Sequence, residues 1–418
     1  MKNFSAIILM FMSCSLGVTA QKAFQLQSPN KKTQVYIDVN KDVSFSVSQN
    51  QEILIEPSVI GMKIIGEKIV GKQPKVKKTT RTSVNRIVAS PLYKKSEIKE
   101  KYNELKIDFK DKYSIVFRAY DKGIAYRFIT TIKRDILVEN EVALYRFPTD
   151  TKGYAAYANR GKSIEEQFTN SFENLYDNQS ISKLNSDKLI ILPFLVQLPN
   201  KKKICITETD LQDYPGQFLQ TNGQDSSLKG IWASLPRVTK QGGHNELQQI
   251  VKERENFLAK TSGNRSFPWR IFVIASQDKD LLTSDLPYLM AEPTKSTDVS
   301  WVKPGKIAWD WWNDWNISGV DFRAGVNNQT YKYYIDFAAK NKIEYLILDE
   351  GWSVNLKADL MQVVPEINLE ELVSYAKEKK VDIILWAGYW AFHRDMEKVI
   401  KHYSAMGIKG FKVDFMDR

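Results

Sequence analysis

The chain has 418 residues, of which 43% are hydrophobic and 26% charged, with only 20 Gly and 14 Pro. This composition excludes a disordered, collagen-like or coiled-coil protein and, at about 150 residues per domain, indicates two or three domains. The formal net charge is +11, but the basic residues are dispersed. The densest cluster, Lys72–Arg86, has no nucleic-acid motif and no interleaved aromatic residues. We therefore expect no nucleic-acid partner.

Residues 1–20 have the layout of a secretory signal peptide, with a short basic start, an apolar stretch and small residues before Gln21. The apolar stretch is shorter than the roughly 20 residues that a membrane-spanning helix needs. We predict cleavage after Ala20, a periplasmic or secreted location and no transmembrane helix. Lipidation at Cys14 is the alternative, although the residues before it fit that signal poorly. Cleavage would leave Cys205 as the single cysteine, so no intrachain disulfide is expected.

From residue 21 to about residue 290 the hydrophobic residues recur with a period of two. Val35–Val39 and Val43–Val47 alternate on either side of a turn at Asn40–Asp42, which predicts a β-hairpin with one buried face. The same pattern recurs at Tyr113–Tyr120, Ile124–Ile129, Lys188–Gln197, Lys202–Thr207 and Trp269–Ala275. Many short strands limited by turns predict a large antiparallel β-sandwich over residues 21–290.

After a linker at residues 291–304, strands alternate with helices. The strands are predicted at Lys306–Asp310, Glu344–Asp349, Asp382–Ala387 and Gly410–Asp414, and the helices at Thr330–Lys342, from Asn368, and at Arg394–Met406. Asn368 with Glu371 resembles a capping box, and the last helix is expected to bury Met396, Val399, Ile400 and Tyr403. Four such units in series predict parallel strands with right-handed crossovers, over residues 305–418.

Carboxylates and aromatic residues follow each of these four strands. They are Asp310 and Trp312 after the first, Asp349, Glu350 and Trp352 after the second, Trp386 in the third, and Lys412 and Asp414 in the fourth. A β/α barrel builds its active site at this end of its strands. Indole faces stack on sugar rings while carboxylates accept hydrogen bonds from the hydroxyls, so we predict a carbohydrate site. Asp310, Asp349 and Glu350 are the proposed hydroxyl acceptors. Trp312, Trp352 and Trp386 are the proposed walls of the site, with ordinary packing as the alternative for each indole.

Lys412 points to the same strand face as Asp414, because the two are separated by two positions. It either binds a sugar hydroxyl and keeps Asp414 ionised or only balances its charge. The three His residues and Cys205 show no zinc-ligand spacing, and no Gly-rich phosphate loop follows a strand.

Several longer motifs together resemble glycoside hydrolase family 97. They are Asp298–Trp301, Lys303–Lys306, Ala308–Trp312, Leu348–Trp352 and Lys412–Arg418 in the second part, and Phe117–Gly123, Glu208–Leu211, Tyr214–Gly216 and Pro268–Arg270 in the first. The resemblance implies an N-terminal β-super-sandwich, a (β/α)8 TIM-type barrel and a small C-terminal β domain. It also implies activity on an oligosaccharide or another α-glycoside, with a calcium ion in the site.

The resemblance also implies roles for two residues. Asp414 takes the place of the nucleophile in the retaining members, with a strand-end cap or salt-bridge partner as the alternative. Glu208 resembles the one calcium ligand that the N-terminal domain supplies, with an ordinary surface acid as the alternative. The retaining branch implies an α-galactosidase, and an α-glucosidase is the runner-up.

The length of the second part departs from the family pattern. Residues 305–418 are 114 residues, whereas a complete barrel takes roughly 250. We therefore expect only the first four barrel strands here, with the general acid/base and the other calcium ligands beyond Arg418. The remaining alternative is a catalytically incompetent fragment.

Overall fold

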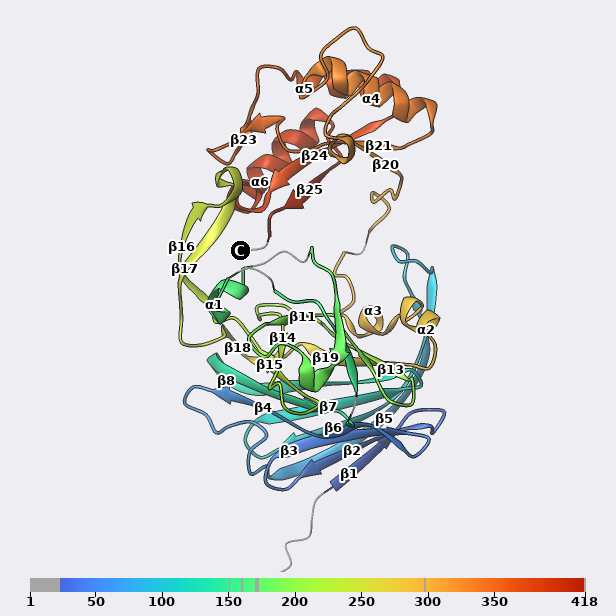
Figure 1. Ribbon diagram of the computed structural model, residues 1–418, viewed down its shortest axis with the longest axis vertical. Helices are drawn as coiled ribbons and strands as arrows, with labels where there is room; N and C mark the ends of the chain where they lie inside the picture. Colours follow the sequence, from blue (N-terminus) through green and yellow to red (C-terminus); the bar gives the residue numbers. More distant parts are fainter. Residues whose placement is uncertain (1–22, 150, 159–160, 170–172, 297, 417–418) are drawn as a thin grey trace, which may run out of the picture.

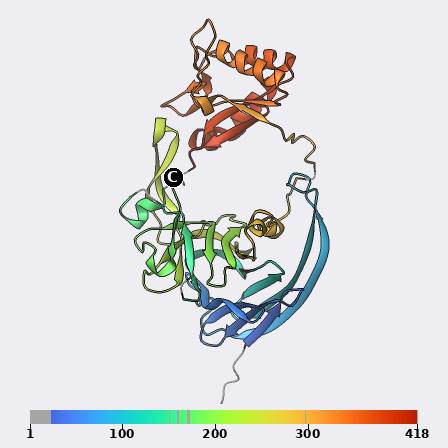
Figure 2. The ribbon, with the colours of Figure 1, turned by 45° about the vertical axis from the view of Figure 1, so that its right-hand side comes forward.

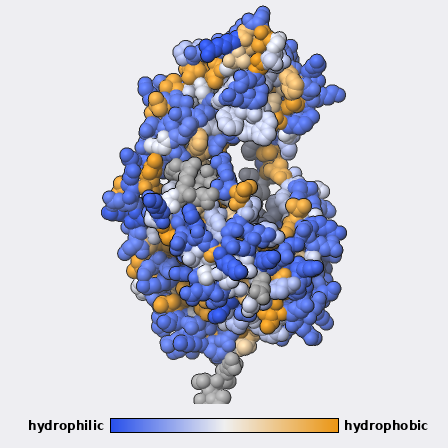
Figure 3. Space-filling view, in the orientation of Figure 1, coloured by the Kyte–Doolittle hydropathy of each residue, from blue (hydrophilic) through white to orange (hydrophobic). Residues whose placement is uncertain are grey.

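A computed structural model describes residues 23–149, 151–158, 161–169, 173–296 and 298–416. The predicted signal peptide, with Cys14 and Ala20, lies outside the described residues. Figure 1 shows a large β part formed by the first two thirds of the chain and a smaller part formed by the last third. Hydrophilic residues cover most of the face shown in Figure 3, with hydrophobic residues scattered among them.

The β part is a network of 17 hydrogen-bonded strands, and its strand pairs are antiparallel. Its strands are β1 (Ala23–Gln27), β2 (Thr33–Val39), β3 (Val43–Gln49), β4 (Glu52–Ile64), β5 (Val76–Ala89), β6 (Glu97–Phe109), β7 (Tyr113–Tyr120), β8 (Gly123–Arg146), β9 (Lys152–Ala155), β10 (Asp177–Ser180), β11 (Ile190–Ile191), β12 (Phe194–Gln197), β13 (Lys203–Thr209), β14 (Phe218–Thr221), β15 (Ser227–Ile231), β18 (Ala259–Ser266) and β19 (Trp269–Ala275). The predicted mostly-β first part is confirmed.

Alternating side chains explain why these strands pair as layers. In β2 and β3, Val35, Ile37, Val43, Phe45 and Val47 are buried, while the residues between them are more exposed. The predicted hairpin forms with Val35 opposite Val47. Strand β8 pairs with β4, β7, β15, β18 and β19 and so joins the layers around one large hydrophobic core. The helices of this part are short: α1 (Ile164–Gln167), α2 (Asp278–Leu282) and α3 (Leu286–Met290).

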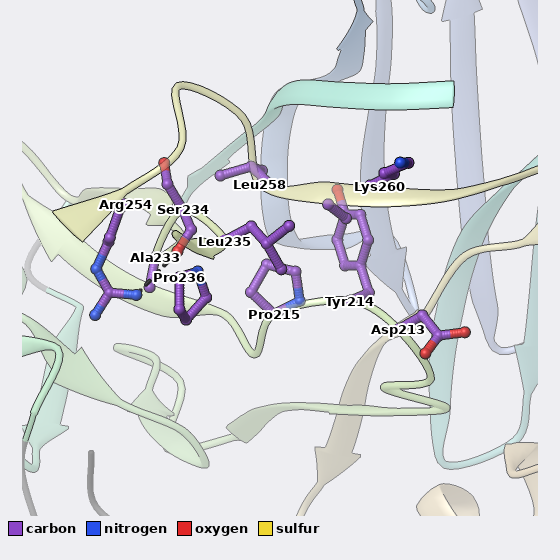
Figure 4. A pocket seen from close by; sticks show the side chains of 11 residues that line it. Asp213, Tyr214, Pro215, Ala233, Ser234, Leu235, Pro236, Arg254, Leu258 and Lys260 are labelled. Carbon is purple, nitrogen blue, oxygen red and sulfur yellow. Dashed lines mark hydrogen bonds between the residues drawn. The ribbon is translucent and has the colours of Figure 1, made fainter. Parts of the chain in front are cut away.

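One hairpin of the β part stands apart from this network. Strands β16 (Pro236–Gly242) and β17 (Gln248–Arg254) pair only with each other among the described strands. The hairpin runs from the β part to the second part on one side of the molecule, while the linker joins the parts on the other side (Figures 1 and 2). At its foot lies a cavity of about 310 Å³ lined by Tyr214, Leu235, Pro236 and Arg254, among others (Figure 4). Arg254 fixes this foot by donating to the Ser234 carbonyl oxygen at 2.9 Å.

The second part is built on a four-stranded parallel sheet in the order β20 (Ile307–Trp309), β21 (Tyr345–Leu348), β24 (Asp382–Gly388) and β25 (Gly410–Asp414). The register places Ala308 beside Leu346, Leu346 beside Ile383, and Leu385 beside Phe411. A short hairpin of β22 (Ser353–Val354) and β23 (Asp359–Val363) follows β21. The four strands therefore end at one edge, as the sequence predicts.

Three helices connect and cover this sheet: α4 (Asn328–Lys340), α5 (Leu369–Glu378) and α6 (Tyr389–Met406). Asn368 caps α5 as predicted by accepting a hydrogen bond from the Glu371 amide at 3.1 Å, but the expected capping box is not completed, because the Glu371 carboxylate binds Asn328 and Lys332 instead. Helix α6 begins five residues earlier than expected, and Gly407 ends it with a φ of 114°.

The expected burial of Met396 and Ile400 is wrong, because both are exposed while Val399 and Tyr403 are buried. The backbone of α6 is non-helical at Asp395, and the face that contacts the sheet is the one carrying residues 399 and 403. Among the described residues, no helix is both long and apolar enough to cross a membrane.

Candidate active site

Asp414 is the last residue of β25 and lies at the carboxyl edge of the parallel sheet. Its Oδ2 accepts a hydrogen bond from Lys412 Nζ at 3.0 Å and one from Trp386 Nε1 at 3.3 Å. Its Oδ1 accepts from the Phe415 amide at 2.9 Å. The side chain keeps 44% of its surface exposed. It is therefore held in one orientation and is still accessible to a substrate.

Lys412 joins two of the predicted residues. Its Nζ lies 2.9 Å from Asp349 Oδ2 as well as 3.0 Å from Asp414 Oδ2. Because β21, β24 and β25 are neighbours in the sheet, their strand ends bring these side chains together. The ammonium group also lies 4.7 Å from the centre of the Trp309 ring.

Electrostatics keep Asp414 ionised. Partial burial acts to raise the pKa of Asp414, but the hydrogen bonds from the Phe415 amide, Lys412 and Trp386 and the charge of Lys412 outweigh it, so the pKa lies below its usual value. Burial acts to lower the pKa of Lys412, but its two carboxylate partners raise it above its usual value. Lys412 therefore contributes to the lowered pKa of Asp414 and also balances its charge.

Asp349, at the end of β21, is buried and fully engaged with protein donors. Its Oδ2 accepts from Trp309 Nε1 at 2.5 Å as well as from Lys412, and its Oδ1 accepts from the Glu350 amide at 2.8 Å. Trp309 is the last residue of β20 and was not predicted as a site residue. Trp309 stands next to Asp310 in the motif Ala308–Trp312, and this position was the one sequence signal that pointed to it.

Asp310 is fully buried, so it offers no oxygen to a sugar here. Its Oδ1 accepts from the Trp311 amide at 2.8 Å and both oxygens lie within 3.3 Å of the Asp349 amide. Burial raises its pKa to about 6. Instead of contacting substrate as predicted, Asp310 fixes the backbone of the two strand ends.

The predicted indole walls differ in exposure. Trp352 is fully buried, packs on Tyr403 and donates to the Trp386 carbonyl oxygen at 2.8 Å, so the packing alternative accounts for it. Trp386 is also buried, and its contribution is the hydrogen bond to Asp414. Trp312 is exposed, with its ring 5.8 Å from that of Trp309, and presents a free indole face. Of the three indoles, only Trp312 is placed to act as a wall.

Glu350 is held by residues from both parts of the chain. Its Oε1 accepts from Asn245 Nδ2 at 2.5 Å and from Asn355 Nδ2 at 3.3 Å, and its Oε2 lies 3.3 Å from His244 Nε2. His244 and Asn245 lie between β16 and β17. Sequence reasoning missed both, because nothing in a chain of alternating strands shows where one hairpin docks.

Glu208 lies in β13, in a separate charge network within the β part. Its Oε1 accepts from the Gln217 amide at 2.8 Å, and its Oε2 pairs with Arg270. Burial raises the pKa of Glu208, although the charge of Arg270 acts in the opposite direction. Calcium takes six to eight oxygen ligands, but the described residues hold no group of three or more His, Cys, Asp or Glu side chains that fits a metal. The described part of the chain therefore does not by itself form a calcium site.

The chain thus combines a mostly-β part with a parallel sheet that carries carboxylates and indoles at its carboxyl edge. Residues 26–293 match the family profile described as glycosyl-hydrolase 97 N-terminal, and residues 311–418 match glycoside hydrolase 97. The chain belongs to glycoside hydrolase family 97.

Its relatives are longer than this chain. It is 49% identical, over 98% of its length, to a retaining alpha-galactosidase of Bacteroides thetaiotaomicron, and it spans 62% of that protein. It is 23% identical to a probable retaining alpha-galactosidase of Streptomyces bingchenggensis, over 90% of this chain and 54% of that one.

Two solved structures share the fold at 21% sequence identity. One is a family 97 enzyme from Pseudoalteromonas sp. strain K8 in complex with acarbose, with a TM-score of 0.77 over 93% of this chain and 58% of that one. The other is a beta-arabinopyranosidase, with a TM-score of 0.75 over 94% of this chain and 62% of that one.

Proposed function

We propose that the protein is a retaining α-galactosidase in which Asp414 is the nucleophile. The observation that carries this proposal is an exposed carboxylate at a strand end, kept ionised by Lys412, Trp386 and the Phe415 amide. The 49% identity to a protein named retaining alpha-galactosidase supports the same reaction. The substrate is a terminal α-galactoside.

In this reaction Asp414 attacks the anomeric carbon while the bond to the leaving oxygen breaks and a second carboxyl group donates a proton to that oxygen. The covalent galactosyl–enzyme is then hydrolysed with net retention. Lys412 keeps the nucleophile charged and links it to Asp349, whose remaining contacts are to Trp309 and the backbone. Glu350 and the exposed Trp312 are the groups proposed to contact the sugar. Asp310, whose pKa is raised to about 6 by burial, is too deeply buried to protonate a leaving group.

The alternative substrate is an α-glucoside. The Pseudoalteromonas neighbour was solved with acarbose and, as a variant, with panose. Galactose and glucose differ in one hydroxyl configuration, so the same nucleophile serves either substrate. A catalytically incompetent, sugar-binding protein is the second alternative.

Three further features belong to this proposal. The parallel sheet of β20, β21, β24 and β25 forms the first four strands of a (β/α)8 barrel. Glu208 supplies one calcium ligand, and the others come from outside the described residues. The protein is exported to the periplasm or medium after cleavage near Ala20.

The test uses a form of the protein with a complete catalytic domain and an aryl α-galactoside as substrate. Asp414→Ala should abolish hydrolysis, and external azide should restore turnover by giving a β-galactosyl azide. Asp382→Ala is the matched control, because Asp382 is an exposed acid that begins β24 at the opposite edge of the sheet. Hydrolysis by Asp414→Ala at the wild-type rate would refute Asp414 as the nucleophile. Preferential turnover of an aryl α-glucoside by the wild-type protein would favour the α-glucosidase alternative.

A further inference from the structure

The loop between β16 and β17 is inserted into the second part of the molecule. Leu247 is buried in the hydrophobic core of the α/β part, although it belongs to the β part by sequence. Two backbone hydrogen bonds hold the loop there, from the Leu356 amide to the Asn245 carbonyl oxygen at 3.1 Å and from the Trp390 amide to the Leu247 carbonyl oxygen at 3.3 Å. A Cβ on Gly388 would lie 2.8 Å from Leu247 Cβ, so the approach is close. The loop is therefore docked at a defined position.

This docking places an amide donor at one oxygen of Glu350 and an imidazole nitrogen beside the other. The Asn245 amide donates to Oε1 at 2.5 Å, and His244 Nε2 faces Oε2 at 3.3 Å. Asn245 has a φ of 46° and a ψ of 31°, a left-handed conformation that Asn adopts more readily than most residues. The His244 amide in turn donates to the Oε1 atom of the buried Gln248 at 3.0 Å. The orientation of Glu350 is thus set by the hairpin, with Asn355 as its one further donor among the described residues.

The contacts of His244 place this loop beside the proposed nucleophile. The His244 ring lies 5.0 Å from the Phe415 ring, and Phe415 directly follows Asp414. Phe415 also packs at 5.7 Å against Trp386, the indole that donates to Asp414. The half-exposed His244 and the carboxylate of Glu350 therefore lie at the same end of the sheet as the site.

We propose that Asn245 and His244 are positioning residues that orient Glu350 for a sugar hydroxyl, so that the N-terminal part of the chain helps to determine sugar recognition. The inference rests on the proposed sugar site. A carboxylate with fixed oxygens accepts a hydroxyl hydrogen bond at one position, whereas a carboxylate that has lost its donors must be ordered by the sugar itself. Loss of the donors should therefore weaken binding of the sugar hydroxyl that Glu350 recognises.

The test measures galactose binding by calorimetry, with glucose in parallel, in a form with a complete catalytic domain. Asn245→Gly keeps the left-handed backbone and removes the amide, whereas Asn245→Asp keeps the backbone and places a second carboxylate beside Glu350. His244→Phe keeps the ring next to Phe415 and removes the donor. Thr239→Ala is the matched control, since Thr239 lies in β16 and its hydroxyl accepts a hydrogen bond from the Gln249 side chain within the hairpin.

We expect Asn245→Gly to raise the Kd of galactose about tenfold, because a hydrogen bond to a charged group is lost, and Asn245→Asp to raise it more. His244→Phe should raise it less, and Thr239→Ala should leave it unchanged. Among monodeoxy galactoses, the derivative whose binding is unaffected by Glu350→Gln should also be unaffected by Asn245→Gly. A purely structural role for Asn245 would weaken every derivative equally.

Each negative result has one meaning. Wild-type Kd values in Asn245→Gly, or an equal loss for every deoxy derivative, would overturn the inference. The absence of galactose and glucose binding by the wild-type protein would overturn it as well. Binding with the expected pattern but without hydrolysis would leave the role of the hairpin standing and would refute the proposed enzymatic function instead.

Discussion

Replacing Arg270 with Met should destabilise the β part strongly. Arg270, in β19, is 1% exposed and pairs with Glu141, which is 2% exposed, and Glu208, which is 9% exposed. Its Nε and Nη2 donate to the two Glu141 oxygens at 3.0 and 2.7 Å, and Tyr214 donates to one of them at 3.0 Å. Met fills most of the same volume but leaves both carboxylates buried without a cation. Breaking such a buried pair costs about 3 to 5 kcal/mol.

The assay is urea unfolding of the full chain at neutral pH, followed by tryptophan fluorescence and circular dichroism. The control is Arg134→Met, because Arg134 pairs with Glu67 on the surface, where an ion pair contributes less than about 1 kcal/mol. In Arg270→Met the pKa of Glu208, which burial already raises, should rise further, since the cation that favours its charged form is absent. A raised native pKa lowers stability above the ordinary pKa of the carboxyl, so the deficit should shrink as pH falls through the raised value. Equal neutral-pH stabilities of the two variants would refute this reasoning.

Three other outcomes follow from the site and the sheet. Lys412→Met should move the acid limb of kcat/KM to higher pH, because losing the cation raises the pKa of Asp414 and the nucleophile must be ionised; an unmoved limb would contradict this role. Glu208→Gln should weaken calcium binding in calorimetry without changing the secondary structure of the β part, although loss of the buried pair with Arg270 should lower its stability; an unchanged calcium titration would remove Glu208 as a ligand. The 418-residue chain alone should not hydrolyse aryl α-galactosides, and robust turnover would contradict this expectation. Limited proteolysis should trim the chain to a fragment ending near residues 291–304, because β20 and β25 each have one strand partner among the described residues.

The parallel strands and the position of Asp414 could be predicted from sequence because they depend on local signals. Gly410–Asp414 is observed with the predicted bounds, and Asn368 caps its helix as predicted. A strand that ends in a carboxylate places that carboxylate at the sheet edge whatever the rest of the chain does. The link from Lys412 to Asp414 follows from the two-residue period of a strand.

The burial of individual strand-end residues could not be predicted in the same way. Asp310 and Trp352 follow strand ends and Asp414 lies at one, but only the first two turn into the protein interior. The sequence pattern is the same whether such a residue faces a substrate or the helix layer, because the chain path after the strand decides it. The hydrogen bond between Glu350 and Asn245 is even harder to predict from sequence, since 105 positions separate the two residues.

The inserted hairpin also affects the order in which the molecule assembles. The ribosome releases residues 236–254 before any strand of the parallel sheet, and domains fold as units during synthesis, starting from the N-terminus. Leu247 then has no core to enter until β24 and α6 have been made. The finished hairpin therefore offers a nascent α/β domain a preformed apolar contact, and a substitution of Leu247 would act on the maturation of a domain to which it does not belong by sequence.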